Sequence, residues 1–246
     1  MNELHDALQP AGPVAAHIAE LWWLTVAICA IVFVAVLVAL AIALRRAPRG
    51  DASSPPDLAA LGGPEPRTQR TVSIAVALSI AGLLALLAAS VAADRALAHA
   101  PNDNALHIEV VGHQWWWDVT YDDPQPSRQF RTANEIHIPV HRPVILSLTS
   151  SDVIHSFWVP SLAGKKDLIP GHTLTLQLEA DRPGVYRGQC AEFCGLQHAF
   201  MGFEVVADSA EAYAAWSDAQ RKPASPPSGR AALQGHDLFL SGTCMM

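Results

Sequence analysis

Charged side chains and cysteines are scarce in this sequence, and each scarcity excludes a class of protein. Only 16% of the 246 residues are charged and half are hydrophobic, which excludes a disordered chain. Four cysteines are too few for a small scaffold held together by disulfides. Acidic residues outnumber basic ones by 23 to 16, which argues against a nucleic-acid-binding protein.

Long charge-free runs, by contrast, occur twice, at residues 21–44 and 71–93. A helix of about 20 apolar residues crosses the roughly 30 Å hydrocarbon core of a membrane, so both runs are predicted to span one. Residues 1–20, the flank before the first run, contain no lysine or arginine, which argues against a cleaved signal peptide.

The distribution of arginines predicts the orientation of this helical hairpin. Five arginines lie in the connecting segment, residues 45–70: Arg45, Arg46, Arg49, Arg67 and Arg70. Because positively charged loops are retained in the cytoplasm, this segment is predicted to be cytoplasmic and both chain ends to lie outside. We therefore expect a protein of the bacterial inner (cell) membrane whose C-terminal part is periplasmic or extracellular.

Residues 94–207 change to a period-two pattern, which is typical of β-strands. For example, Leu174, Leu176 and Leu178 alternate with threonine and glutamine. Several short strands separated by turn residues predict a small antiparallel sandwich or barrel. After this domain we predict a terminal helix at residues 208–222, a proline-rich linker at 223–229 and the start of a further helical domain at 230–246.

Four potential metal ligands are concentrated in one short segment, namely Cys190, Cys194, His198 and Met201. Thiolate sulfur with imidazole selects copper or zinc, and the thioether favours copper. Two thiolates can each bridge two metals, in which case His198 is one terminal imidazole and the other comes from elsewhere in the fold. His155, which we place at the end of an apolar strand, is the best candidate.

Met201 and a backbone carbonyl, that of Glu192, would complete such a ligand shell. Other interpretations of these residues stay open at this point. The two cysteines would form a disulfide in an oxidising compartment, or they would hold zinc with the two histidines. A membrane-tethered copper-delivery protein would use similar ligands but hold a single, readily exchanged Cu(I).

Three consecutive tryptophans follow a Gly-His-Gln sequence. Alternation along a strand would place Trp115 and Trp117 on one face and Trp116 on the other. Such rings are usually packing residues, but one exposed indole close to a metal would give an electron an entry point. Trp216, in the predicted terminal helix, is interpreted as a packing residue.

The chain resembles subunit II of haem–copper cytochrome c oxidase. The resemblance rests on the two predicted spans and on three motifs: GHQWWW, HSFWVPSLAGKKDLIPG from His155 and CAEFCGLQHAFM from Cys190. The resemblance implies a two-helix transmembrane hairpin followed by an all-β cupredoxin-like Greek-key sandwich. It also implies a dinuclear copper A centre with these ligands: His155, Cys190, the Glu192 carbonyl, Cys194, His198 and Met201.

The resemblance further implies roles for residues around the copper. Trp115 would be the electron entry point, the Glu192 side chain would reach a magnesium ion shared with subunit I, and Asp152 would face subunit I. Electrons would pass from cytochrome c to haem in subunit I, where oxygen is reduced, so enzyme status belongs to the complex. The implied partners are subunits I and III, cytochrome c or a fused c-type haem domain, and the membrane.

The C-terminal segment, residues 229–239, is similar to the first helix of a c-type cytochrome, a domain that variants of this family carry after a proline-rich linker. Covalent attachment of haem requires Cys-x-x-Cys-His, whereas the sequence ends at Cys244-Met245-Met246. As written, it cannot attach haem. We expect a truncated cytochrome c domain, with haem c bound only if the chain continues beyond Met246.

Overall fold

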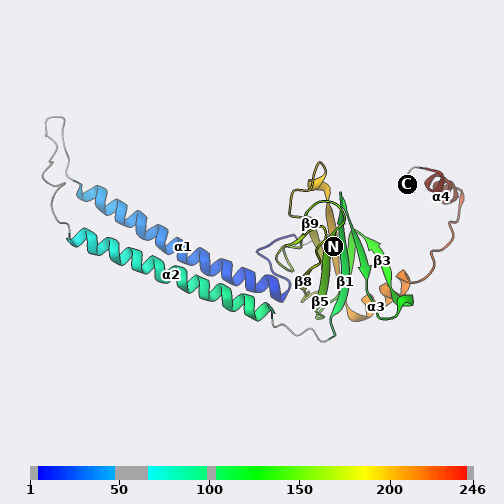
Figure 1. The fold of residues 1–246 in the computed structure, drawn as a ribbon, viewed down its shortest axis with the longest axis horizontal. Helices are drawn as coiled ribbons and strands as arrows, with labels where there is room; N and C mark the ends of the chain where they lie inside the picture. Colours follow the sequence, from blue (N-terminus) through cyan, green and yellow to red (C-terminus); the bar gives the residue numbers. More distant parts are fainter. Residues whose placement is uncertain (1–4, 48–65, 99–103, 243–246) are drawn as a thin grey trace.

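The structure is a computed structural model that describes residues 5–47, 66–98 and 104–242; Arg49 and Cys244 lie outside these ranges. A pair of long helices stands beside a β-sandwich, and two short helices follow it (Figure 1). In chain order the helices and strands are α1 (Pro13–Arg46), α2 (Pro66–Ala98), β1 (Leu106–His113), β2 (Trp116–Tyr121), η2 (Pro126–Arg128), β3 (Phe130–Ala133), β4 (Glu135–Pro139), β5 (Val144–Ser150), β6 (His155–Trp158), β7 (Lys166–Leu168), β8 (Leu174–Leu178), β9 (Gly184–Cys190), η3 (His198–Phe200), β10 (Gly202–Asp208), α3 (Ala210–Gln220) and α4 (Arg230–Ser241).

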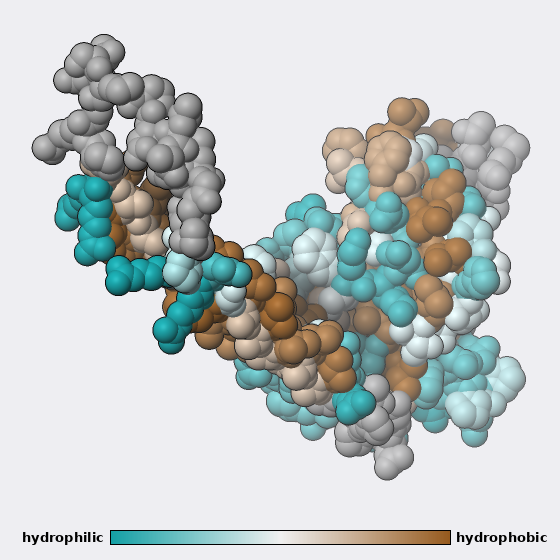
Figure 2. Space-filling model, turned by 60° about the vertical axis from the view of Figure 1, so that its left-hand side comes forward, coloured by the Kyte–Doolittle hydropathy of each residue, from teal (hydrophilic) through white to brown (hydrophobic). Residues whose placement is uncertain are grey.

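Helices α1 and α2 lie side by side, and their apolar side chains face outward over most of their length (Figures 1 and 2). Both are long and apolar enough to cross a membrane, and the most apolar window of each is 0% buried within the protein. They are therefore not core helices of the sandwich. The predicted span began at residue 21, but helix α1 begins earlier, at Pro13, because proline is well suited to the first helical turn.

The segment before α1 packs on the sandwich instead of extending away from it. The Ala11 amide donates to the Ser161 carbonyl at 2.7 Å, and the Asp181 amide donates to the Ala11 carbonyl at 2.8 Å. Gly12 follows, where a Cβ atom would lie 2.0 Å from the Glu179 carbonyl oxygen. These contacts join the first turn of α1 to the sandwich.

The sandwich consists of two five-stranded sheets, with strand orders β3-β2-β1-β5-β8 and β4-β10-β9-β6-β7. The predicted fold class, an apolar helical hairpin followed by an all-β sandwich, is confirmed. The expectation of purely antiparallel strands is wrong, since β1 pairs with β5 and β10 pairs with β4 in parallel. Period-two patterning reports which face is buried and carries no information about strand direction.

The core lies between the sheets and consists of alternating strand residues with aromatic rings at its centre. Val110, Leu146 and Ile138 are fully buried, as are Trp117 and Phe157. Trp117 lies edge-on to Phe157 with ring centroids 5.8 Å apart. Because each sheet buries one face, the remaining face and the connecting loops are left to form binding sites.

Helix α3 closes one end of the sandwich. Its N-cap is Ser209, and the Ser209 hydroxyl accepts a hydrogen bond from the Ala212 amide. Trp216 stacks on His137 with ring centroids 4.0 Å apart and lies edge-on to Tyr121 at 5.3 Å. The interpretation of Trp216 as a packing residue is confirmed.

Candidate metal centre

The loop between β9 and β10 supplies four of the predicted ligands. Cys190 is the last residue of β9, Cys194 lies in the loop, His198 begins η3, and Met201 directly precedes β10. The loop can turn back on itself because Gly195 adopts a φ of +117°, which L side chains rarely adopt. The two flanking strands are paired with each other, so both ends of the loop are fixed.

His155 reaches this loop from another part of the chain. It is the first residue of β6, which is the strand beside β9, and the register places Phe157 opposite Cys190. The expectation that His155 ends an apolar strand is therefore wrong. The apolar strand β5 ends at Ser150, and a bend separates it from β6. The His155 side chain is completely buried.

The donor atoms of these residues converge on one small volume. The distance from His155 Nδ1 to Cys190 Sγ is 3.9 Å, and that from His198 Nδ1 to Cys194 Sγ is 3.5 Å. The Sδ atom of Met201 lies 3.7 Å from Cys194 Sγ. The donor atoms of His155, Cys190 and Cys194 all lie within 4.8 Å of one another. The residues that the sequence singled out are thus brought together.

The two cysteine sulfurs are unbonded thiols 3.8 Å apart. A metal–thiolate bond is about 2.3 Å long, so one ion can contact both sulfurs at once, and a second can do so from the other side. An imidazole nitrogen lies beside each sulfur, which provides a terminal ligand at either end. The donor set of thiolate, imidazole and thioether fits copper.

The backbone carbonyl of Glu192 also faces this volume, because its oxygen lies 3.1 Å from Cys190 Sγ. The side chain of Glu192 is exposed, and no bond from it to the ligand cluster is formed. The carbonyl and the carboxylate of Glu192 therefore lie in different environments. The first faces the sulfur pair and the second faces solvent.

The thiols of this pair differ in acidity. Burial raises the pKa of the Cys190 thiol, but hydrogen bonding to His155 and to backbone groups outweighs it and lowers this pKa to about 6. Burial, together with the negative charge of Cys190, raises the pKa of Cys194 to about 12. Near neutral pH the metal-free pair therefore holds one proton, on Cys194, which a bound metal must displace.

Asp152 fixes the orientation of His155. Its carboxylate lies 2.8 Å from His155 Nε2 and accepts a hydrogen bond from the Gln114 amide at 2.7 Å. A proton on Nε2 leaves the lone pair of Nδ1 directed at the sulfurs, which is the tautomer that a metal requires. Hydrogen bonds from His155, Val153 and Gln114 outweigh burial and lower the pKa of Asp152, so it is ionised at neutral pH. Sequence analysis placed Asp152 near a partner subunit and missed this contact.

Gly112 provides the space for the His155 ring and was also missed from the sequence. A Cβ atom at this position would lie 2.7 Å from His155 Cδ2 and 3.1 Å from Cγ. The His155 ring is buried and bonded to Asp152, so it cannot move aside for an added methyl group. The glycine that precedes the three tryptophans is thus required by packing against a candidate ligand.

Substitution Gly112→Ala is expected to displace His155 and weaken copper binding by about tenfold or more, in line with the roughly 1–3 kcal/mol cost of overpacking a core. Competition with a copper chelator measures the change. Gly235→Ala is the matched control, since no atom lies within 4 Å of a Cβ placed there. Equal copper affinities for the two variants would contradict the packing role of Gly112.

Trp115 was expected to lie on one strand with the other two tryptophans, but it does not. It occupies the turn between β1 and β2, with Trp117 fully buried and Trp116 38% exposed. The Trp115 indole Nε1 donates to the Cys194 carbonyl at 3.2 Å, and the Gln114 side chain donates to the same oxygen at 2.7 Å. The half-buried indole therefore connects the surface to the backbone of a candidate ligand.

Comparisons with known proteins identify the family of this chain. A sequence model of the family "Cytochrome C oxidase subunit II, periplasmic domain" matches residues 124–209. Cytochrome c oxidase subunit 2 of Alkalihalophilus pseudofirmus is 35% identical over 97% of this chain and 69% of its own length. The chain belongs to the cytochrome c oxidase subunit II family. Members of this family are part of an oxidoreductase complex, and the family implies copper.

Two solved structures of subunit II are also similar to this chain. The periplasmic domain of subunit II from Bradyrhizobium japonicum is 30% identical, with a TM-score of 0.45, over 47% of this chain and 93% of that one. A mixed disulfide intermediate between a thioredoxin-like protein and a subunit II periplasmic domain is 29% identical, with a TM-score of 0.43, over 47% of this chain and 90% of that one.

Proposed function

We propose that this subunit II accepts electrons from cytochrome c at a dinuclear copper A centre and passes them to haem in subunit I, where oxygen is reduced to water. The observation that carries the proposal is the pair of buried sulfurs 3.8 Å apart with an imidazole nitrogen beside each one. A copper pair bound there would supply one-electron acceptance and donation.

Each residue of the site has a defined task in this function. Cys190, Cys194, His155 and His198 would hold the copper ions, with one imidazole nitrogen beside each sulfur. Met201, only 1% exposed, fills the remaining side and excludes water. The rigid β-scaffold holds these groups in one geometry, which keeps reorganisation on a change of charge small. The Glu192 carbonyl would be the last ligand, and its exposed side chain would hold a magnesium ion with subunit I.

The helical hairpin supports a membrane-anchored arrangement. Arg45 and Arg46 end α1, and Arg67 and Arg70 lie in the first turns of α2, so basic residues gather at one end of the hairpin. By the preference of positive charge for the cytoplasm, that end is cytoplasmic and the sandwich lies in the periplasm. Docking partners of the sandwich would then be subunits I and III and an exported cytochrome c. Helix α4 is the proposed start of a cytochrome c domain.

Copper loading of the purified full chain tests the proposal. We expect two copper ions per chain and an electron paramagnetic resonance spectrum in which one unpaired electron couples equally to two copper nuclei. Coupling to a single nucleus, or one readily exchanged Cu(I) per chain, would instead indicate a copper-delivery protein. A metal-free protein with joined Cys190 and Cys194 sulfurs would refute the function outright.

Substitution Trp115→Phe should slow electron entry from reduced cytochrome c severalfold while copper content stays unchanged. Phenylalanine keeps an aromatic ring but removes the indole N–H that donates to the Cys194 carbonyl. Stopped-flow oxidation of cytochrome c by the assembled oxidase measures the rate. The control is Trp116→Phe, because Trp116 stacks on His113 and is 38% exposed. Loss of copper in Trp115→Phe, or equal slowing in both variants, would leave Trp115 a packing role only.

A further inference from the structure

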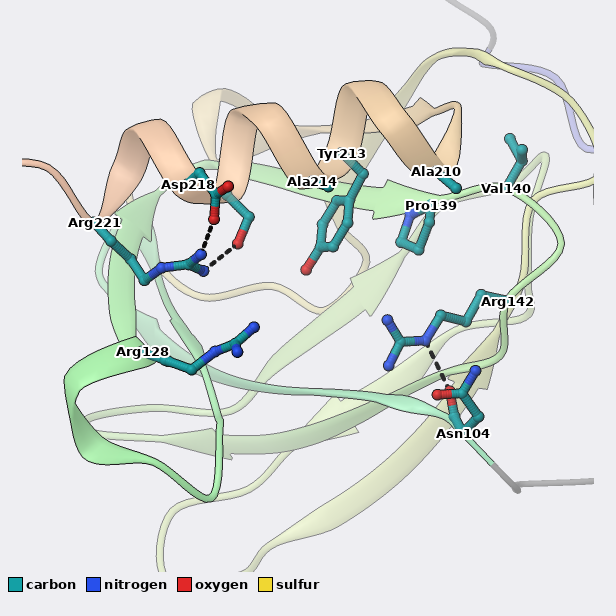
Figure 3. Close-up of a pocket in the computed structure, with 11 residues that line it drawn as sticks. Asn104, Arg128, Pro139, Val140, Arg142, Ala210, Tyr213, Ala214, Asp218 and Arg221 are labelled. Carbon is teal, nitrogen blue, oxygen red and sulfur yellow. Dashed lines mark hydrogen bonds and ion pairs between the residues drawn. The ribbon is translucent and has the colours of Figure 1, made fainter.

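Three arginines surround a hollow at the end of the sandwich that α3 closes. A cavity of about 410 Å³ lies beneath this helix, within the 300–1,000 Å³ that is typical of small-ligand sites. The guanidinium groups of Arg128, Arg142 and Arg221 and the hydroxyl of Tyr213 point into the same space (Figure 3). A second hollow of about 330 Å³ borders the same four side chains.

The arginines retain donors that no described residue uses. Arg142 is half-buried and donates from Nε to the Asn104 carbonyl at 2.8 Å and from Nη2 to the Ala105 carbonyl at 3.5 Å. Within the described ranges it pairs with no carboxylate. A guanidinium has five N–H donors, so three of those on Arg142 have no partner among the described residues.

The other two arginines each pair with one aspartate. Arg221 pairs with Asp218, which lines the cavity, and Arg128 pairs with Asp123 at 3.3 Å. Asp122 borders the second hollow and accepts a hydrogen bond from the Gln129 side chain. The 410 Å³ cavity is thus lined by three arginines and one aspartate, in a chain whose net charge is −7. Because Arg128 and Arg221 each have a carboxylate partner, Arg142 carries the positive charge that no described carboxylate balances.

Tyr213 adds a neutral donor beside these charges. Among the described residues its hydroxyl forms no hydrogen bond, and in Figure 3 it points between the arginine side chains. Burial raises the pKa of Tyr213, and the nearby charges of Arg142 and Arg221 oppose that rise without outweighing it. At neutral pH the phenol is protonated and can donate to an anion.

We propose that this cavity binds a phosphate group, carried by a free phosphate compound or by a phospholipid headgroup. Planar guanidinium forks match the paired oxygens of phosphate, and three of them with one hydroxyl satisfy a tetrahedral, doubly charged ligand. The cavity is larger than one phosphate and leaves room for a substituent. It lies at the opposite end of β10 from Met201, since α3 follows the end of that strand. The site is therefore separate from the metal centre.

Titration calorimetry of the full chain in detergent, with inorganic pyrophosphate as the probe, tests this proposal. Wild type should bind saturably, and Arg142→Gln and Arg128→Gln should each weaken binding by at least about tenfold, because hydrogen bonds to charged groups are the strong ones. The control is Arg182→Gln, an exposed arginine outside the cavity, which should change affinity less than about twofold on the same grounds. Arg128 is 54% exposed, so its variant tests the site even where Arg142→Gln perturbs folding.

A second titration, with dihexanoyl phosphatidic acid in the same detergent, separates the two sources of phosphate. Tighter binding of the lipid, competitive with pyrophosphate, assigns the site to a phospholipid headgroup. Binding of pyrophosphate alone assigns it to a free phosphate compound. Absence of saturable binding by both probes, or equal weakening by Arg182→Gln and the cavity variants, overturns the proposal.

Discussion

Replacement of Cys194 by serine is expected to abolish the two-copper site and, with it, electron transfer through the assembled oxidase. A serine hydroxyl is a poor ligand for copper, so only the sulfur of Cys190 would remain where two sulfurs are needed to bridge two ions. We expect copper content to fall below two ions per chain, and coupling to two nuclei to disappear from the paramagnetic resonance spectrum.

The chain contains its own control for this experiment. Cys29 is a free, exposed cysteine in α1, far along the sequence from the metal loop. Substitution Cys29→Ser removes the same chemical group and should leave copper content, spectrum and oxidase activity unchanged. Retention of two strongly coupled coppers in Cys194→Ser would refute the role of its sulfur as a bridge between metals.

Removal of the Asp152 carboxylate should lower copper affinity by about 10- to 100-fold, the range found when groups that orient metal ligands are lost. Asp152→Ala deletes the acceptor at His155 Nε2 and the acceptor for the Gln114 amide together. His155 then loses the partner that selects its tautomer, and the turn that holds Trp115 loses an anchor. Chelator competition measures affinity, and copper hyperfine splitting reports the changed environment of His155.

Asp122→Ala is the matched control for Asp152→Ala. Asp122 is exposed and lies just beyond the end of β2, whereas the turn that precedes the other end of that strand contains Trp115, whose indole donates to the Cys194 carbonyl. Its removal should leave both copper affinity and the hyperfine splitting unchanged. If Asp152→Ala kept wild-type affinity and spectrum, His155 would be held by packing alone, and the carboxylate would have no positioning role.

The ligand types and the helical hairpin were predictable because the necessary information is local. Four of the candidate ligands lie within residues 190–201, so their chemistry and spacing are visible in the sequence: Cys190, Cys194, His198 and Met201. Apolar runs long enough to cross a membrane are visible in the same way. Period two also predicted a sandwich, although it did not distinguish parallel from antiparallel neighbours.

Contacts between distant segments were not predictable in the same way. His155 and Cys190 are 35 residues apart and meet only because β6 pairs with β9. The space that Gly112 leaves for the His155 ring depends on the packing of one sheet against the other. Trp115 was placed on a strand by alternation, but the chain turns there, and alternation fails wherever a strand ends.

By itself, the sequence determined which atoms this protein offers to a metal and which segments are apolar enough for a membrane, since both properties belong to side chains and their local spacing. The tertiary structure decided which of those atoms meet. It placed His155 beside the cysteines, oriented it through Asp152, and gathered three arginines from separate segments around one cavity. These arrangements depend on strand pairing and sheet packing, in which residues far apart in the chain become neighbours only when the whole sandwich has formed.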